Sequence, residues 1–130
     1  MNKPRILIVD DEPNLSDLVR LFLEETNRYE VCVENRSAHA LAVTRKFGPD
    51  LILLDVDMPG KDGGEVAADI QAVPAFRSVP IIFLTSLISR EEAGDRETVR
   101  GGMRFLAKPV NQKVLIEVVD RTLATATRAE

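Results

Sequence analysis

The chain has 130 residues, of which 45% are hydrophobic and 29% are charged, and its formal net charge at pH 7 is −4. These values are typical of one globular domain, expected over residues 1–130 with a core at about 4–124, and the acidic balance argues against a nucleic-acid-binding domain. Cys32 is the single cysteine, so an internal disulfide is excluded. No apolar run approaches the roughly 20 residues that span a bilayer, so the sequence predicts no membrane span. We therefore expect a cytoplasmic protein.

Strand-like and helix-like patterns alternate along the first half of the chain. The β-branched run at 5–9 predicts a buried strand, and 29–33 predicts a second one. Between them, Pro13 stands where a helix tolerates proline, at its first residue, and apolar residues then recur at helical spacing. Ser37 is expected to cap a further helix at about 38–47.

The same alternation continues through the second half. Three more strands are expected from short apolar runs, at 51–54, 79–85 and 104–107. Helices are expected near 64–72, over the polar segment 89–100, and after Asn111, which can cap the last one. Strands separated by single helices predict an α/β fold of the (βα)5 type, in which a five-stranded parallel sheet is doubly wound, with helices on both faces.

Polar side chains stand at the carboxyl ends of four of these strands. They are Asp10 and Asp11 after the first strand, Asp55 after the third, Thr85 at the end of the fourth and Lys108 after the fifth. Ligands of open parallel sheets bind beyond the carboxyl ends of the strands. The three acids therefore meet in one pocket if the first and third strands are neighbours.

Three carboxylates in one pocket need a cation or shared protons, because two unit charges about 5 Å apart repel by about 3 kcal/mol at an effective dielectric constant near 20. Oxygen ligands suit Mg²⁺, and Mn²⁺ would fit the same ligands, whereas no cluster of Cys and His indicates zinc. A carboxylate beside a metal, a lysine and a hydroxyl can become an aspartyl phosphate. The residues themselves therefore indicate the handling of a phosphoryl group.

Four stretches of the sequence together resemble the receiver domain of two-component response regulators, the CheY-like family. They are ILIVDDEP at 6–13, LILLDVDMPGKDG at 51–63, IIFLTS at 81–86 and RFLAKPV at 104–110. They occur in the order and at the separations of that family, across almost the whole chain. The resemblance implies a flavodoxin-like fold with the strand order 2-1-3-4-5.

The resemblance also implies roles for individual residues. Asp55 would be the phosphoacceptor and one of the metal ligands. Asp10 and Asp11 would hold Mg²⁺, the second more directly, and Asp57 would offer the metal its backbone carbonyl. Lys108 would pair with the acceptor and then with the phosphoryl group.

A conformational switch is implied by the same resemblance. Thr85 would move toward the phosphoryl group, and the Phe105 ring would turn inward to fill the space that is left. The surface of the fourth helix, fifth strand and fifth helix would change with them. The Lys108–Pro109 bond is expected to be cis.

The implied function is a phosphorylation-dependent response regulator receiver. It would not be an enzyme beyond self-catalysed phosphotransfer and autodephosphorylation. Its phosphoryl donor would be a sensor histidine kinase or a phosphotransfer protein, and its signal would pass to a downstream output domain or target protein. This domain itself is expected to contact neither nucleic acid nor membrane, and to be a monomer or a phosphorylation-linked dimer.

Two other functions share parts of the pattern. A pseudo-receiver has the same fold without phosphorylation, but it would be expected to lack the acceptor, the acidic pair or the lysine, all of which are present. A haloacid-dehalogenase-like phosphatase also carries an apolar strand that ends in Asp-x-Asp, as Asp55 and Asp57 do. In that family the acidic pair should follow the lysine, and the chain leaves no room for a cap domain. A nucleotide-binding protein is disfavoured because no phosphate-binding glycine loop is present.

Overall fold

The computed structural model describes residues 2–86, 98–100 and 103–129. Its centre is a six-stranded sheet with the strand order β2-β1-β3-β4-β6-β5. The strands are β1 (Arg5–Val9), β2 (Glu30–Glu34), β3 (Leu51–Asp55), β4 (Ile81–Thr85), β5 (Thr98–Arg100) and β6 (Met103–Ala107). All except β5 pair in parallel. The predicted parallel sheet with strand order 2-1-3-4-5 is therefore confirmed, with β6 as its fifth strand.

The sixth strand, β5, departs from the sequence-based expectation. It pairs antiparallel with β6, and Arg100 lies opposite Met103. The helix expected over 89–100 is wrong for its last three residues, and its residues 89–97 lie outside the described part of the chain. Thr98 and Val99 are β-branched, which favours a strand, and pairing with β6 supplies their backbone with hydrogen-bond partners.

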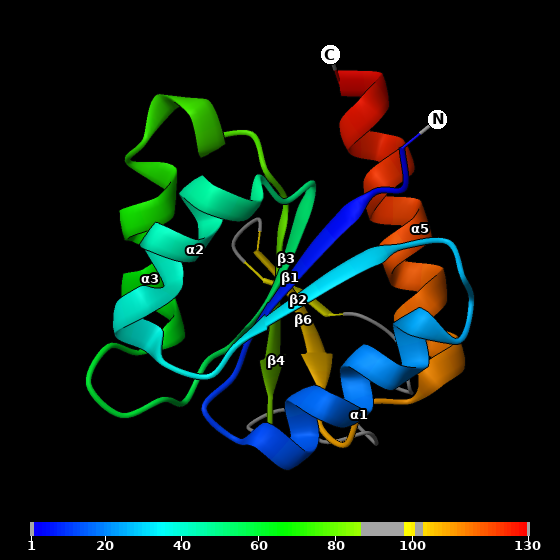
Figure 1. Cartoon of the computed structure of the whole chain (residues 1–130), viewed down its shortest axis with the longest axis horizontal. Helices are drawn as coiled ribbons and strands as arrows, with labels where there is room; N and C mark the ends of the chain where they lie inside the picture. Colours follow the sequence, from blue (N-terminus) through cyan, green and yellow to red (C-terminus); the bar gives the residue numbers. More distant parts are fainter. Residues whose placement is uncertain (1, 87–97, 101–102, 130) are drawn as a thin grey trace.

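Helices cover both faces of the sheet. They are α1 (Pro13–Glu24), α2 (Ala40–Phe47), α3 (Gly63–Gln71) and α5 (Gln112–Ala129), with the 3-10 turns η1 (Ser37–His39) and η2 (Pro74–Phe76). In Figure 1, α2 and α3 lie on one side of the sheet and α1 and α5 lie on the other, and the two chain ends lie at the same end of the molecule. None of the described helices is long and apolar enough to cross a membrane.

The hydrophobic core forms two layers because successive side chains of a strand point to opposite faces. Ile6 and Ile8 of β1 belong to the layer under α1 and α5, whereas Leu7 and Val9 belong to the layer under α2 and α3. All five residues of β3 are buried. Burial of both faces fixes the register of the central strands, and so it fixes which residues meet at their ends.

The sequence signals for helix starts hold at α1 and α5 but not at the helix after β2. Pro13 opens α1, and the Asn111 side chain accepts the backbone N–H of Val114 at 3.1 Å at the start of α5, as the sequence predicts. The expected cap by Ser37 is wrong, because this residue lies inside η1 and makes no capping hydrogen bond. Its hydroxyl donates instead to the Pro59 carbonyl at 3.2 Å, in the loop after β3.

Candidate functional site

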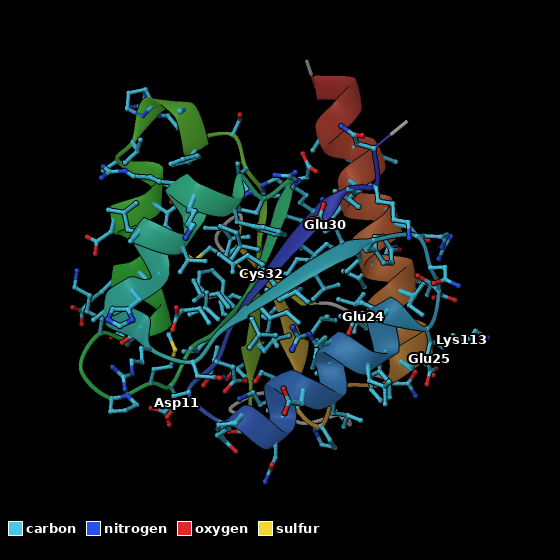
Figure 2. All side chains as sticks on the ribbon, in the orientation of Figure 1. Asp11, Glu24, Glu25, Glu30, Cys32 and Lys113 are labelled. Carbon is cyan, nitrogen blue, oxygen red and sulfur yellow. The ribbon has the colours of Figure 1, made fainter. Side chains whose placement is uncertain are left out.

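Three acids meet where the carboxyl ends of β1 and β3 lie side by side. Val9 is opposite Leu54 in the register of the two strands, so the residues that come next, Asp10 and Asp55, are neighbours. Asp10, Asp11 and Asp55, called the acid cluster below, each offer a carboxylate oxygen, and these oxygens lie within 4.8 Å of one another. Figure 2 shows Asp11 at the end of the molecule opposite the chain termini. The predicted convergence is present.

Lys108 reaches the acid cluster from the end of β6. Its ammonium Nζ lies 2.9 Å from Asp55 Oδ1 and 3.4 Å from Asp10 Oδ2, and its side chain is 12% exposed. The backbone N–H of Lys108 donates to the Thr85 carbonyl at 2.8 Å, which ties the end of β6 to the end of β4. The Lys108–Pro109 bond is cis, as expected.

Backbone donors satisfy only part of the acid cluster. The Glu12 N–H donates to Asp10 Oδ1 at 3.0 Å, and the Asp57 N–H donates to Asp55 Oδ1 at 3.3 Å. Asp11 Oδ1 and Asp55 Oδ2 are buried and accept no hydrogen bond from the described residues. A buried carboxylate oxygen without a partner is costly, and a hard cation would satisfy both oxygens. The donor set therefore fits Mg²⁺, which takes carboxylate oxygens and completes its shell with waters and phosphate oxygens.

The charge balance of the site favours a cation in the same way. Burial raises the pKa of Asp10 from 3.8 to about 6, with a further rise from the Asp55 charge, against the Glu12 N–H and Lys108, which lower it. Burial, followed by the closeness of Asp55, also raises the pKa of Asp11. For Lys108, burial lowers the pKa, but the hydrogen bond to Asp55 and the charges of both neighbouring acids outweigh it and raise the pKa overall. Three carboxylates against one ammonium leave excess negative charge that a divalent cation would offset.

Gly63 allows the first turn of α3 to pack directly against the end of β3. A Cβ atom at this position would lie 2.5 Å from the Asp55 carbonyl oxygen and 2.9 Å from Val56 Cα, closer than real Cβ contacts. The Gly63 N–H donates to the Val56 carbonyl at 2.9 Å. This close approach holds the backbone that carries Asp55.

The two expected switch residues lie on neighbouring strands. Thr85 is the last residue of β4, is 4% exposed and lies opposite Ala107 of β6. The Phe105 ring is partly buried and stacks on the Phe83 ring, with centroids 5.3 Å apart. The fourth helix, which would complete the expected switch surface, falls on residues outside the described part of the chain.

Access to Asp55 is restricted in this conformation. Asp55 is 1% exposed, whereas Asp11 and Lys108 are partly exposed. The side chain of Asp57 is exposed as well, so this residue faces the site through its backbone. Asp55 Oδ2 is therefore closed to solvent in this conformation.

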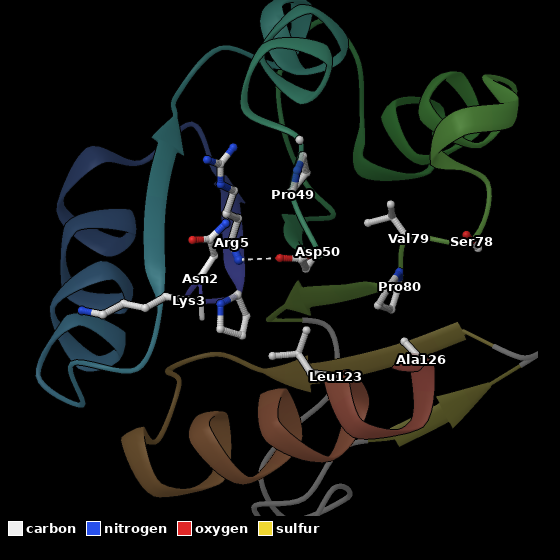
Figure 3. Close-up of a pocket in the computed structure, with 12 residues that line it drawn as sticks. Asn2, Lys3, Arg5, Pro49, Asp50, Ser78, Val79, Pro80, Leu123 and Ala126 are labelled. Atoms are coloured by element: carbon white, nitrogen blue, oxygen red, sulfur yellow. Dashed lines mark hydrogen bonds between the residues drawn. The ribbon is translucent and has the colours of Figure 1, made fainter. Parts of the chain in front are cut away.

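A large cleft lies elsewhere, at the edge where β1, β3 and β4 begin (Figure 3). It has a volume of about 690 Å³. The backbone N–H of Arg5 donates to Asp50 Oδ2 across its floor at 2.7 Å, and the Arg5 guanidinium pairs with Glu30 at 3.2 Å. The cleft is thus at the far end of the strands from the acid cluster and shares no residue with it.

Asn35 lies at the same edge of the sheet as the acid cluster, but it is not among the site residues predicted from the sequence. Asn35 directly follows β2, just as Asp10 follows β1. Its side-chain amide donates to the Asp10 carbonyl at 2.7 Å. The same rule that draws attention to the carboxyl ends of the strands would have included it.

Comparison with known proteins agrees with this geometry. A family model described as the response regulator receiver domain matches residues 6–120, which contain the acid cluster, Thr85 and Lys108. This chain belongs to the response regulator receiver domain family. The resemblance that the sequence motifs indicate is therefore confirmed.

Its curated relatives include regulators and a sensor protein. The transcriptional regulatory protein ResD of Bacillus subtilis is 37% identical over 129 residues, which cover 98% of this chain and 50% of ResD. The sensor protein GacS of Pseudomonas syringae is also 37% identical over 129 residues, which cover 96% of this chain and 14% of GacS. This chain thus corresponds to half or less of these two relatives.

Solved receiver structures have the same fold. The chemotaxis protein CheY4 of Vibrio cholerae superposes with a TM-score of 0.79 at 27% identity, covering 93% of this chain and 99% of CheY4. The signal receiver domain of a signal transduction histidine kinase from Syntrophus aciditrophicus gives a TM-score of 0.79 at 31% identity, covering 98% of this chain and 95% of that domain. The CheY-like, flavodoxin-like architecture is confirmed.

Proposed function

We propose that the domain formed by residues 1–130 is a phosphorylation-dependent receiver in which Asp55 accepts a phosphoryl group. The observation that supports this most is the state of the two Asp55 oxygens. Oδ1 accepts hydrogen bonds from the Lys108 ammonium and the Asp57 N–H, whereas Oδ2 is buried without a hydrogen-bond partner among the described residues. Oδ1 is thus held by protein donors, whereas Oδ2 has none and is the oxygen that a cation or an electrophilic phosphorus would contact.

The proposed reaction is an in-line phosphoryl transfer from a phosphohistidine of a sensor histidine kinase or phosphotransfer protein. A carboxylate oxygen of Asp55 forms a bond to phosphorus while the bond between phosphorus and the histidine nitrogen breaks, and that nitrogen keeps the electron pair. Lys108 already contacts Asp55, so its ammonium is placed to offset charge on the transferred group. Water later cleaves the acyl phosphate and releases inorganic phosphate, so the chain returns to its starting state.

Mg²⁺ is the metal that this site would hold, with Mn²⁺ as a substitute. Asp10, Asp11 and Asp55 would supply carboxylate oxygens, and Asp57 would supply its backbone carbonyl. When bound, the metal supplies positive charge that stabilises the transferring phosphoryl group. Asp10 and Asp11, whose raised pKa values reflect burial and like charge, would then be held ionised.

Phosphorylation would change the conformations of Thr85 and Phe105, and a partner protein would recognise the resulting surface. Thr85 ends the strand beside that of Lys108, so its hydroxyl is within the part of the fold that a phosphoryl group on Asp55 would affect. The stacked Phe105 ring lies on the same strand pair, and β6 and α5 carry the surface that would present the change.

The partner would be a downstream output domain or target protein, a proposal that the name of the regulator ResD supports. Beyond self-catalysed transfer and hydrolysis, we propose no enzymatic activity.

The experiment that tests this function is intact-mass spectrometry after incubation with acetyl phosphate. We expect the mass to increase by one phosphoryl group in the presence of Mg²⁺ and to stay unchanged when the metal is chelated. Asp55→Asn should remove the labelling, whereas Asp69→Asn, which changes a partly exposed carboxylate paired with Lys61, should not. A wild-type chain that stays unlabelled under all conditions would favour a pseudo-receiver.

A further inference from the structure

We propose that Asn35 is a positioning residue for the acid cluster, acting through the backbone that joins Asp10 to Asp11. This inference rests on the function proposed above. Asn35 lies one residue beyond the end of β2 and carries no charge. Its side-chain amide nitrogen donates two hydrogen bonds, to the Asp10 carbonyl oxygen at 2.7 Å and to Ser16 Oγ at 2.9 Å.

The first of these bonds acts on both members of the acidic pair. The Asp10 carbonyl belongs to the planar peptide unit that connects Asp10 to Asp11. Holding its oxygen therefore fixes the plane from which the Asp11 side chain extends. Asp11 Oδ1 is buried and accepts no hydrogen bond from the described residues, so the orientation of the Asp11 backbone decides where this carboxylate oxygen lies.

The second bond connects the same amide to the first turn of α1. Ser16 is fully buried, and its hydroxyl donates to the Pro13 carbonyl at 3.1 Å while it accepts from Asn35. Asn35 thus joins the end of β2, the turn after β1 and the start of α1 through one side chain. The Asp10 N–H also donates to the Glu34 carbonyl at 3.1 Å, in the residue before Asn35. The last residue of β2 and the residue after it therefore hold the Asp10 backbone at both its N–H and its carbonyl.

Ser37 gives an internal comparison within the same segment. Its hydroxyl donates to the Pro59 carbonyl at 3.2 Å and accepts the Lys61 N–H at 3.4 Å, so it contacts the loop that follows Asp55. Both bonds are long and exposed to solvent, whereas those of Asn35 are short and partly buried. Because long, exposed bonds contribute less, removal of the Ser37 hydroxyl should affect the site less than removal of the Asn35 amide.

The test compares Asn35→Ala with Thr26→Ala, a matched control. Thr26 also makes two hydrogen bonds, to the Leu23 carbonyl at 2.7 Å and from the Arg28 N–H at 3.1 Å, but it precedes β2 and lies at the other end of that strand. Both variants should lose stability to a similar extent in urea. Asn35→Ala should weaken Mg²⁺ binding about tenfold, the lower end of the range for residues that orient metal ligands. Thr26→Ala and Ser37→Ala should change it less than threefold.

A second readout uses the metal-free protein and needs no phosphorylation. The Glu12 N–H, which donates to Asp10 Oδ1, should exchange with solvent at least tenfold faster in Asn35→Ala than in Thr26→Ala. Equal exchange of Glu12 in the two variants, or Mg²⁺ affinity in Asn35→Ala that matches wild type, would overturn the positioning role. If wild type itself neither binds Mg²⁺ nor becomes labelled, the proposed function fails, while the exchange measurement still decides whether Asn35 holds this turn.

Discussion

Replacing Asp10 with asparagine should make the metal-free protein more stable at neutral pH. Asp10 is fully buried, and its pKa of about 6 means that the folded state disfavours its ionised form. Asparagine has nearly the same shape and can still accept the Glu12 N–H, but it has no charge to bury. The Asp10→Asn variant therefore keeps the packing and this hydrogen bond while it removes the cost of a buried carboxylate.

The size of the effect follows from the difference between the two states of the chain. In the unfolded chain the Asp10 carboxyl has its ordinary pKa of 3.8, and in the folded chain its pKa is about 6. Below about pH 4 the group is protonated in both states and does not lower the free energy of unfolding. As the pH rises through about 6, the unfolded chain releases the proton more readily, so wild-type stability falls. A difference of about 2 in pKa corresponds to about 3 kcal/mol.

Urea unfolding with a chelator present, followed from pH 4 to pH 7, measures this directly. We expect Asp10→Asn and wild type to have similar free energies of unfolding near pH 4, and the variant to be more stable by up to about 3 kcal/mol at pH 7. Asp69→Asn removes a partly exposed carboxylate paired with Lys61 and should shift stability by less than about 1 kcal/mol. If Asp10→Asn is less stable than wild type at pH 7, or if their difference does not vary with pH, then burial of the ionised Asp10 carries no such cost.

Three further substitutions test the surroundings of Asp55, the proposed phosphoacceptor. Asp11→Ala should weaken Mg²⁺ binding severalfold in a metal titration, because it removes a ligand oxygen, and an unchanged titration would remove Asp11 from the site. Gly63→Ala should lower the free energy of unfolding by about 1 to 3 kcal/mol in urea, since its Cβ would lie 2.5 Å from the Asp55 carbonyl oxygen; wild-type stability would show that this contact relaxes freely. Lys108→Met leaves Asp55 and Asp10 without their ammonium partner, so metal-free stability should fall by about 3 kcal/mol and labelling by acetyl phosphate should slow at least tenfold. Labelling of that variant at the wild-type rate would argue that the lysine does not assist transfer.

The parallel part of the fold was predictable from the sequence because buried strands leave a simple signal. The run at 51–54 is apolar on both faces of the strand. This pattern is typical of a parallel sheet that helices cover on both sides. Once the first and third strands are neighbours, the positions of Asp10 and Asp55 follow from the register. Lys108 follows in the same way, because β6 pairs with β4.

Features that depend on side-chain geometry were not predictable in the same way. Ser37 has the residue type and position of a helix cap, yet its hydroxyl bonds to the loop after β3, a contact between segments far apart in sequence. The strand β5 was missed because the polar pattern of 89–97 favoured a helix over the whole segment. The sequence does contain a strand signal there, since the β-branched Thr98 and Val99 come shortly before the glycine pair 101–102, which is typical of hairpins. The proposed role of Asn35 depends on its side-chain amide donating to the Asp10 carbonyl. The sequence does not indicate which carbonyl the amide contacts.

The central claim is that Asp55 itself carries the phosphoryl group, and its chemical location is the most direct test. Borohydride reduces an acyl phosphate to an alcohol, so treatment of the labelled protein followed by peptide mass spectrometry converts the phosphorylated aspartate into homoserine at its own position. We expect this conversion at position 55, only after incubation with both phosphodonor and Mg²⁺. Homoserine at position 10, 11 or 57, or none at all in a protein that has gained the mass of a phosphoryl group, would contradict the account.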